Sequence, residues 1–283
     1  MRRLFTILFC IISSFLFAQD GLEGVIVERY YTSTEADNAG KLISGDLPAG
    51  SVTYRIYVDL KPGFRFQAAY GSPEHELFIE STAPIFNHAD AGTTNAHIFP
   101  ERVIKKDVGL LDSWLSVGGA SENHWGVLLS NDSLAHDASV TFQEGFLQNK
   151  SKGQKYTLRE RNGLYRVGES PFPTFFQIDS SLMVLGSATK GNKFSVKNGA
   201  WAAMGKGSVG IDSLTTNTVL IAQITTAGDL KFELNLLIGA PNGTSQKYVA
   251  KNPTFGEWVH PDLIFDSTKK KSKKKKNKSK KRK

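Results

Sequence analysis

Alternating hydrophobic and polar residues predict strands along most of the chain. In the segment "SVTYRIYVDL" apolar residues occupy every second position, at Val52, Tyr54, Ile56, Val58 and Leu60. A period of two places these side chains on one face of an extended strand. The Lys-Pro-Gly turn at 61–63 is followed by Phe64 and Phe66. This order predicts a hairpin.

Further strands are predicted at 24–31, 76–82, 110–117, 125–129 and 140–142, and the segment 217–239 predicts a second hairpin around Gly228 and Asp229. The Asn162-Gly163 step suits a tight turn with positive φ. No stretch keeps the apolar spacing of a helix over three turns. The 26 glycines and the recurrent turn signals favour an all-β fold, an antiparallel β-sandwich of jelly-roll type. No Pro- or Ser-rich linker divides 22–265, so we expect one domain rather than two.

The first 18 residues have the composition of a secretory signal peptide. Two arginines at positions 2 and 3 precede an apolar run of 14 residues, and Ala18 supplies a small residue before the polar Gln19. An uncleaved membrane anchor is the alternative, but a spanning helix needs about 20 apolar residues. Cleavage would remove Cys10, which is the only cysteine, and with it any disulfide or thiol chemistry. The sequence therefore predicts export to the cell surface or the medium.

The charges divide the chain into an acidic body and a cationic tail. Of the 35 Lys and Arg residues, 12 lie in the last 15 positions and two lie at positions 2 and 3, which leaves 21 against 27 Asp and Glu. The body, at 19–266, thus carries a net charge of about −6 and the tail, at 267–283, carries +12. A run of like charges without apolar residues cannot bury surface, so we expect the tail to be disordered.

The tail has two interpretations. It is either a solubilising appendage or an electrostatic attachment to an anionic polymer such as lipopolysaccharide, acidic polysaccharide or released DNA. Lysine supplies point charges without the geometry to read a base, so such attachment would be unspecific and sensitive to salt. The candidate polyanion contacts are Lys269, Lys270, Lys271, Lys273, Lys274, Lys275, Lys276, Lys278, Lys280, Lys281, Arg282 and Lys283.

The four tryptophans are the candidates for sugar binding by the body. Exposed aromatic faces on a β-sandwich can stack on sugar rings, although tryptophan is more often part of the core. Trp114 lies among alternating apolar residues and is predicted to be core. Trp201 and Trp258 lie among turn residues and are the candidate carbohydrate contacts.

Known catalytic and metal-binding motifs are absent. The chain has no G-x-S-x-G, no H-E-x-x-H, no Gly-rich phosphate loop and no EF-hand spacing. Glu74 and Glu76 share a strand face from which His75 points away, so we expect a solvated turn rather than a metal site. The polar loop 87–97 holds too few carboxylates for calcium. The sequence therefore predicts no catalytic residue, no metal and no cofactor.

Four segments carry a resemblance to a known family. These are "TYRIYVDL", "FQAAYGSPEHELFIEST", "LLDSWLSVGG" and "NTVLIAQITTAGDLKFELNLLIG". Together they resemble a family of uncharacterised secreted bacterial β-domains, over most of residues 22–250. The resemblance implies export and a place outside the cell, but it supplies no catalytic residues, and the lysine tail is not part of its pattern.

These observations lead to one functional hypothesis and two rivals. The hypothesis is a secreted, non-enzymatic surface or matrix protein, retained on anionic polymers by its tail, whose β-domain contributes a carbohydrate-binding or adhesive contact. The first rival is a polysaccharide-active enzyme with two facing carboxylates, a glycosidase or a lyase. The second is a structural subunit of a surface assembly.

Overall fold

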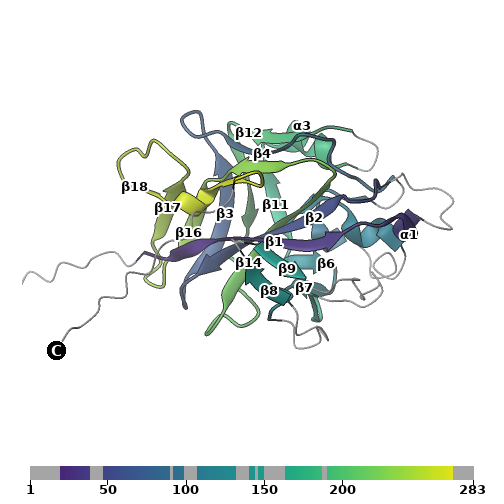
Figure 1. Ribbon diagram of the computed structural model, residues 1–283. Helices are drawn as coiled ribbons and strands as arrows, with labels where there is room; N and C mark the ends of the chain where they lie inside the picture. Colours follow the sequence, from purple (N-terminus) through teal and green to yellow (C-terminus); the bar gives the residue numbers. More distant parts are fainter. Residues whose placement is uncertain are drawn as a thin grey trace, which may run out of the picture.

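The protein is built mostly of strands, which form four sheets (Figure 1). The computed structural model describes residues 20–38, 47–89, 92–98, 107–131, 140–143, 146–149, 163–186 and 190–269. Its helical segments are three to five residues long: α1 (Glu35–Asn38), η1 (Ala96–Ile98), η2 (Asp107–Leu111), α3 (Asp179–Leu182), η3 (Met183–Leu185) and η4 (Pro261–Leu263). None of the helices in these ranges has the length and apolar character needed to cross a bilayer. The prediction of an all-β, mainly antiparallel fold is confirmed.

Sheet 1 has six strands. In spatial order they are β5 (Trp114–Leu115), β14 (Asn217–Thr226), β2 (Val52–Leu60), β1 (Leu22–Thr32), β9 (Phe146–Asn149) and β8 (Val140–Gln143). The three long strands at its centre pair antiparallel, and only β1 and β9 pair parallel. The strands predicted around 52–60 and 217–226 are therefore neighbours, although most of the chain separates them.

Three further sheets surround sheet 1. Sheet 2 consists of β11 (Pro173–Phe176), β13 (Gly199–Ala203), β3 (Arg65–Gly71), β16 (Leu236–Gly239), β17 (Ser245–Val249) and β18 (Glu257–Val259). Sheet 3 consists of β12 (Lys193–Val196), β4 (Leu77–Ser81), β15 (Leu230–Glu233) and β19 (Ile264–Asp266). Sheet 4 is small and consists of β10 (Leu164–Arg166), β7 (His124–Gly126) and β6 (Gly119–Ser121).

The two predicted hairpins are corners between sheets instead. The turn at 61–63 leads from β2 in sheet 1 to β3 in sheet 2, and the turn at 228–229 leads from β14 in sheet 1 to β15 in sheet 3. The apolar face continues through each corner, so that Ile56 before the first turn and Phe66 after it are buried in the same core. The alternating pattern specified the buried face correctly, but it did not specify the pairing partner.

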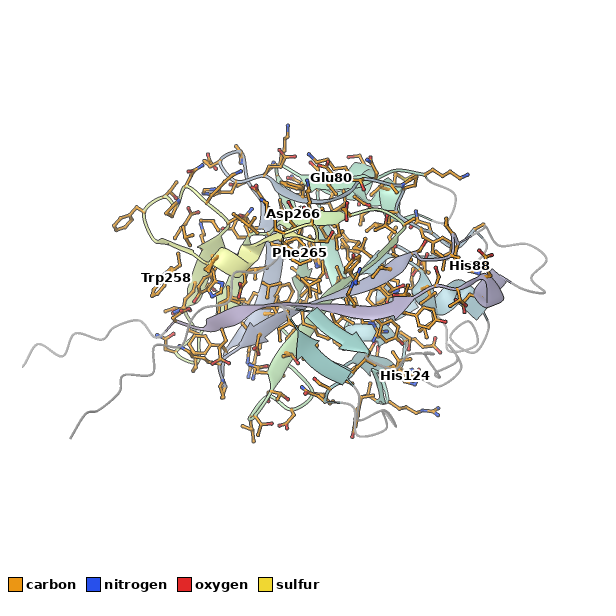
Figure 2. All side chains as sticks on the ribbon, in the orientation of Figure 1. Glu80, His88, His124, Trp258, Phe265 and Asp266 are labelled. Atoms are coloured by element: carbon orange, nitrogen blue, oxygen red, sulfur yellow. The ribbon has the colours of Figure 1, made fainter. Side chains whose placement is uncertain are left out.

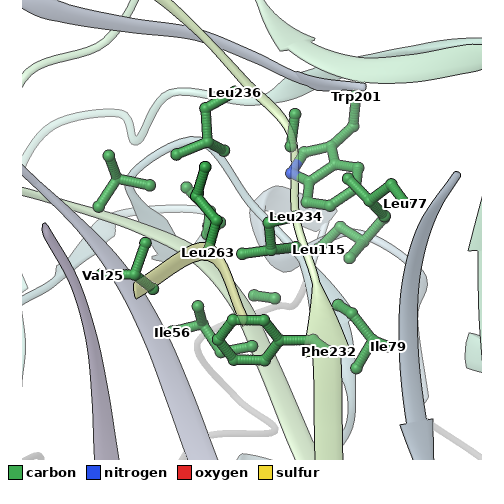
Figure 3. Close-up of a cluster of buried hydrophobic side chains, with 14 of the residues drawn as sticks. Val25, Ile56, Leu77, Ile79, Leu115, Trp201, Phe232, Leu234, Leu236 and Leu263 are labelled. Carbon is green, nitrogen blue, oxygen red and sulfur yellow. The ribbon is translucent and has the colours of Figure 1, made fainter. Parts of the chain in front are cut away.

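The main core lies between sheet 1 and the pair of sheets 2 and 3. Sheet 1 contributes Val25 and Ile56, sheet 3 contributes Leu77 and Phe232, and sheet 2 contributes Trp201, as Figure 3 shows. All five are at most 5% exposed. A core of this size stabilises a domain without disulfides.

The opposite face of sheet 1 is buried as well, beneath the segment 107–131. Trp114 packs there, and its predicted place in a core is confirmed. The continuous strand predicted at 110–117 is wrong, because this segment forms part of η2 and then the two-residue strand β5. Side chains on both sides of the segment are buried, and the buried Asp112 accepts backbone hydrogen bonds from His88 and Thr93. These hydrogen bonds stabilise the irregular backbone of the segment around Asp112.

Candidate functional site

Trp201 cannot stack on a sugar, because the structure buries it completely. Its indole N–H donates to the Ser116 carbonyl oxygen at 3.2 Å, and its ring meets Phe194 edge-on with the centroids 5.8 Å apart. The expected exposure of this side chain is therefore wrong. Gly199 and the alanines around Trp201 belong to β13, an interior strand of sheet 2, and not to the turn that their composition suggested.

Trp258 lies on the edge strand β18 and is 36% exposed. The fully exposed Phe255 and the exposed Val259 lie near it in sequence. Figure 2 shows Trp258 at the left of the molecule, far from His124 at the lower right. Trp258 lines none of the grooves that the structure describes. Its role as a carbohydrate contact therefore stays a prediction.

Most of the cationic tail lies outside the described residues. Lys269 is described, and its ammonium group is 3.6 Å from a carboxylate oxygen of Asp266. The backbone N–H of Ser267 donates to the Leu230 carbonyl oxygen at 2.9 Å. The folded contacts thus continue past residue 266, where the body was expected to end.

His75 is buried rather than solvated. Its Nε2 is 2.9 Å from a carboxylate oxygen of Glu257, whereas Glu76 accepts a hydrogen bond from the Ser195 hydroxyl group. Burial raises the pKa of Glu257, but hydrogen bonds from Thr254 and His75 outweigh that effect, and the pKa is lowered. His75 and Glu76 have different hydrogen-bond partners although both line one pocket, and the expected solvation of the histidine is wrong.

Within the described ranges no three His, Cys, Asp or Glu side chains are placed to hold a metal ion. In the polar loop 87–97, Asp90 lies outside those ranges. His88 is buried, and His97 places its Nδ1 3.2 Å from the Ser170 hydroxyl oxygen. The described histidines of this loop are therefore interpreted as packing and hydrogen-bonding residues of the fold.

A groove of about 460 Å³ combines aromatic and polar groups between sheets 2 and 4. We call it the aromatic groove. Its lining residues are Val117, Trp125, Glu169, Ser170, Pro171, Phe172, Ala203, Met204, Gly207, Ser208 and Val209. Trp125 is partly exposed, and Phe172 and Met204 are 53% and 62% exposed. Such exposure of large apolar side chains around one groove is typical of a binding surface.

The two aromatic rings are held by rigid neighbours. Trp125 lies on β7, between Tyr165 of β10 and Gly119 of β6. Phe172 lies between two prolines, and its ring packs on His97 with the centroids 5.3 Å apart. The two prolines lack backbone donors, which restricts strand pairing around Phe172. The rings are therefore positioned before any ligand arrives, which reduces the entropy lost on binding.

A buried hydroxyl group without a partner lies at the floor of the aromatic groove. Ser208 is 6% exposed, and its Oγ has no hydrogen-bond partner among the described residues. A buried polar atom without a partner costs about 1–3 kcal/mol. A ligand hydroxyl group in the groove could satisfy Ser208 and remove that cost.

Gly118 makes room for the groove. Its φ is +122°, a conformation that L side chains rarely adopt. A Cβ atom there would be 3.1 Å from both Pro171 and the Ser208 hydroxyl group, and 3.8 Å from the Trp125 ring. Any larger residue at Gly118 would therefore fill the space between the ring and the hydroxyl group.

Glu169 is the only carboxylate that lines the aromatic groove in the described part of the chain. Glycoside hydrolysis requires two carboxyl groups on opposite sides of the scissile bond. The arrangement therefore suits the binding of a polyhydroxyl ligand better than its cleavage.

Comparisons of the chain with protein-family models, with curated proteins and with solved structures gave no match. The resemblance to secreted bacterial β-domains therefore stays a prediction. The site is interpreted from the chemistry of its own residues.

Proposed function

We propose that the protein is a non-enzymatic carbohydrate-binding protein of the cell surface or extracellular matrix. One observation carries the proposal: the aromatic groove places the partly exposed ring of Trp125 and the exposed ring of Phe172 around the Ser208 hydroxyl group, which has no partner among the described residues. A sugar ring has an apolar face of C–H groups and a rim of hydroxyl groups. The aromatic rings of the groove can pack on the apolar face, and its polar groups can bind the hydroxyl groups.

The polar residues of the groove fit the rim of a sugar. The Glu169 carboxylate accepts hydrogen bonds, and the Ser208 hydroxyl group can donate one and accept others. The Ser170 hydroxyl group already donates to the Ser121 carbonyl oxygen and its oxygen lies 3.2 Å from His97 Nδ1, so it can offer a ligand no more than one acceptor position. The groove therefore favours ligands rich in O–H donors.

The cationic tail adds retention on anionic polymers in this proposal, on the basis of its sequence. Each Lys or Arg near an anionic surface contributes about 1 kcal/mol, and the 12 cations of the tail suffice even after a large reduction for salt. The tail provides attachment and the aromatic groove provides specificity.

The test is the affinity of the purified protein for a panel of neutral and acidic polysaccharides at raised salt, which suppresses binding by the tail. The Trp125→Ala and Phe172→Ala variants should each weaken the best ligand about tenfold, since the loss of one stacking contact is worth about 1 kcal/mol. Phe255→Ala is the matched control, because Phe255 is exposed but does not line the groove. All variants should remain folded at the temperature of the binding assay, which their thermal unfolding midpoints check, although Trp125→Ala is expected to lower the midpoint.

Three results would contradict the proposal. Either no polysaccharide binds, or Phe255→Ala weakens binding as much as Trp125→Ala, or the bound polymer is cut. The last is measured as new reducing ends or unsaturated products after prolonged incubation, with Glu169→Gln as the variant that should stop it. Cleavage would favour the enzyme hypothesis.

A further inference from the structure

A second groove, of about 610 Å³, lies across one turn from the aromatic groove. We call it the donor groove. Its lining residues are Gly63, Arg65, Gln67, Gly205, Lys206, Gly239, Ala240, Pro241, Gly243 and Thr244. The turn at 204–207 borders both grooves, because Met204 and Gly207 line the first while Gly205 and Lys206 line the second.

The donor groove is cationic although the body of the chain is acidic. No carboxylate belongs to its described lining, which contains both Arg65 and Lys206. Arg65 is partly buried and Lys206 is exposed, and neither forms an ion pair with a described residue. Arg65 and Lys206 therefore line the same groove, and neither is neutralised by a described carboxylate.

Gln67 contributes a third donor. Its Oε1 accepts a hydrogen bond of 2.7 Å from the Ser245 hydroxyl group, which leaves the two hydrogens of Nε2 for other acceptors. A Cβ atom on Gly239 would come within 2.8 Å of that Nε2, so the glycine makes room for the amide beside the groove. The side chains of Arg65, Gln67 and Lys206 thus supply donors of hydrogen bonds.

The backbone connects the two grooves rigidly. Phe66 and Ser208 form a reciprocal pair of backbone hydrogen bonds, each 2.8 Å long. In β3 the neighbours of Phe66 are Arg65 and Gln67, which face the donor groove, while Ser208 lies at the floor of the aromatic groove. Gly207 has a φ of +87°, and a Cβ atom there would be 3.2 Å from the Arg65 Cβ. The turn can therefore pack directly on β3.

We propose that the donor groove binds carboxylate or sulfate groups of an acidic polysaccharide whose sugar rings lie in the aromatic groove. This inference rests on the proposed function and names its ligand class. A guanidinium group can bind a carboxylate or sulfate through two parallel hydrogen bonds, and the Lys206 ammonium group adds a point charge. Glu169 favours an uncharged part of the polymer in the aromatic groove, so the anionic groups are assigned to the donor groove.

The experiment compares three polymers: a polyuronate, the same polymer after reduction of its carboxyl groups to alcohols, and a sulfated polysaccharide. The variants are Arg65→Gln and Lys206→Gln. Lys197→Gln is the control, because Lys197 is an exposed cation two residues before Gly199, which pairs with Gly71 at the far end of β3 from Arg65. The tail is the same in all variants, so differences between them report on the body alone.

At raised salt, which suppresses binding by the tail, we expect the parent protein to bind one of the two anionic polymers at least about tenfold more tightly than the reduced polymer. Arg65→Gln and Lys206→Gln should each remove most of this preference and leave the affinity for the reduced polymer unchanged. Lys197→Gln should change no affinity by more than about twofold. The preferred anionic polymer identifies the group as carboxylate or sulfate.

The two proposals fail in different ways. If Lys197→Gln weakens binding as much as Lys206→Gln, net charge and not the donor groove attracts the polymer, and this inference is wrong. It is also wrong if all three polymers bind equally while Trp125→Ala weakens each of them, a result that leaves the proposed function intact. If Trp125→Ala and Phe172→Ala bind every polymer normally, the proposed function fails and the inference fails with it.

Discussion

The guanidinium group of Arg55 lies over the ring of Tyr30, with Cζ 3.6 Å from the ring centroid. Both residues are buried on the face of sheet 1 that lies beneath the segment 107–131. The Arg55 Nε donates to Gln223 at 2.8 Å and one terminal nitrogen donates to the Gly163 carbonyl oxygen at 2.9 Å. Arg55 therefore joins β1, β2 and β14 to the start of β10.

Replacing Arg55 should destabilise the protein strongly. Glu28 lies opposite Arg55 in the pairing of β1 with β2 and is fully buried. Arg55→Met removes the buried positive charge that faces this carboxylate and interacts with it, so it should lower the free energy of unfolding by about 3 kcal/mol or more. Urea unfolding measures the loss. Lys247→Met, at an exposed position of β17, should change the stability by no more than about 0.5 kcal/mol. If the two variants change the free energy of unfolding equally, the buried contacts of Arg55 stabilise the protein no more than an exposed lysine does, and the prediction is wrong.

Stability should fall as the pH rises from about 4 to about 7, because of Asp112. Burial raises the pKa of this carboxyl group from 3.8 to about 7, although backbone hydrogen bonds oppose the rise. The folded state therefore binds the proton more tightly than the unfolded chain. The stabilisation that protonation provides is complete below pH 3.8 and is lost as the pH passes about 7. The change is on the order of 2–4 kcal/mol.

The control for this pH dependence is Asp112→Asn, measured by urea unfolding at several pH values. The amide cannot ionise, so the variant should show a flatter profile. At acidic pH it should be less stable by about 1 kcal/mol, since one of the two backbone donors from His88 and Thr93 loses its acceptor. A profile as steep as that of the parent would mean that another group is responsible. Asp59, whose pKa burial raises to about 6, would then be the next candidate.

Two glycine substitutions should have opposite consequences. A Cβ atom on Gly71 would lie 1.9 Å from the Val196 carbonyl oxygen, a backbone atom that cannot move without separating the strands. Gly71→Ala should therefore lower the stability by about 2 kcal/mol or more. Gly168 is exposed, and a Cβ atom there would have no other atom within 4 Å, so Gly168→Ala should be neutral or stabilising by up to about 1 kcal/mol. Thermal unfolding of both variants distinguishes these outcomes.

Removing the tail should alter attachment without altering the fold. The truncation should follow Lys269, because the Ser267 and Thr268 backbone N–H groups donate to Leu230 and Asp266. Deletion of 270–283 should keep the unfolding midpoint unchanged. It should also abolish the steep salt dependence of retention on lipopolysaccharide and DNA, which the body is not proposed to bind. If the retention and its salt dependence persist in the truncated protein, the tail is a solubilising appendage.

The sequence predicted which residues are buried more reliably than which strands are paired. Alternation in 52–60 identified the core face of β2 because the period of a strand is a local property. Its partner β14 was not predictable in this way, since pairing depends on long-range geometry. The composition of a turn gives no pairing information, and the turn at 61–63 proved to be a corner.

The candidate site was less predictable still. The glycine and alanine residues around Trp201 suggest a surface turn, but they lie partly buried in a strand of sheet 2 from which Trp201 alone is fully buried in the core. Trp125 and Phe172 come from segments about 50 residues apart and meet only in the folded chain. The one local signal was the Pro-Phe-Pro sequence at 171–173, since flanking prolines leave an aromatic residue outside a regular ladder. The donor groove had no local signal, because Arg65 and Lys206 are brought together by a turn packing on a strand.

The pairing of β2 with β14 has a consequence for the order of events in folding. The Thr53 and Thr225 hydroxyl groups are 2.7 Å apart in the folded protein, although 172 positions separate them along the chain. Contacts of such large sequence separation make folding slow, in the range of milliseconds to seconds, because a long loop must close before they form. A growing chain cannot complete sheet 1 until β14 has been synthesised. The nascent protein therefore stays incompletely folded until most of its length exists.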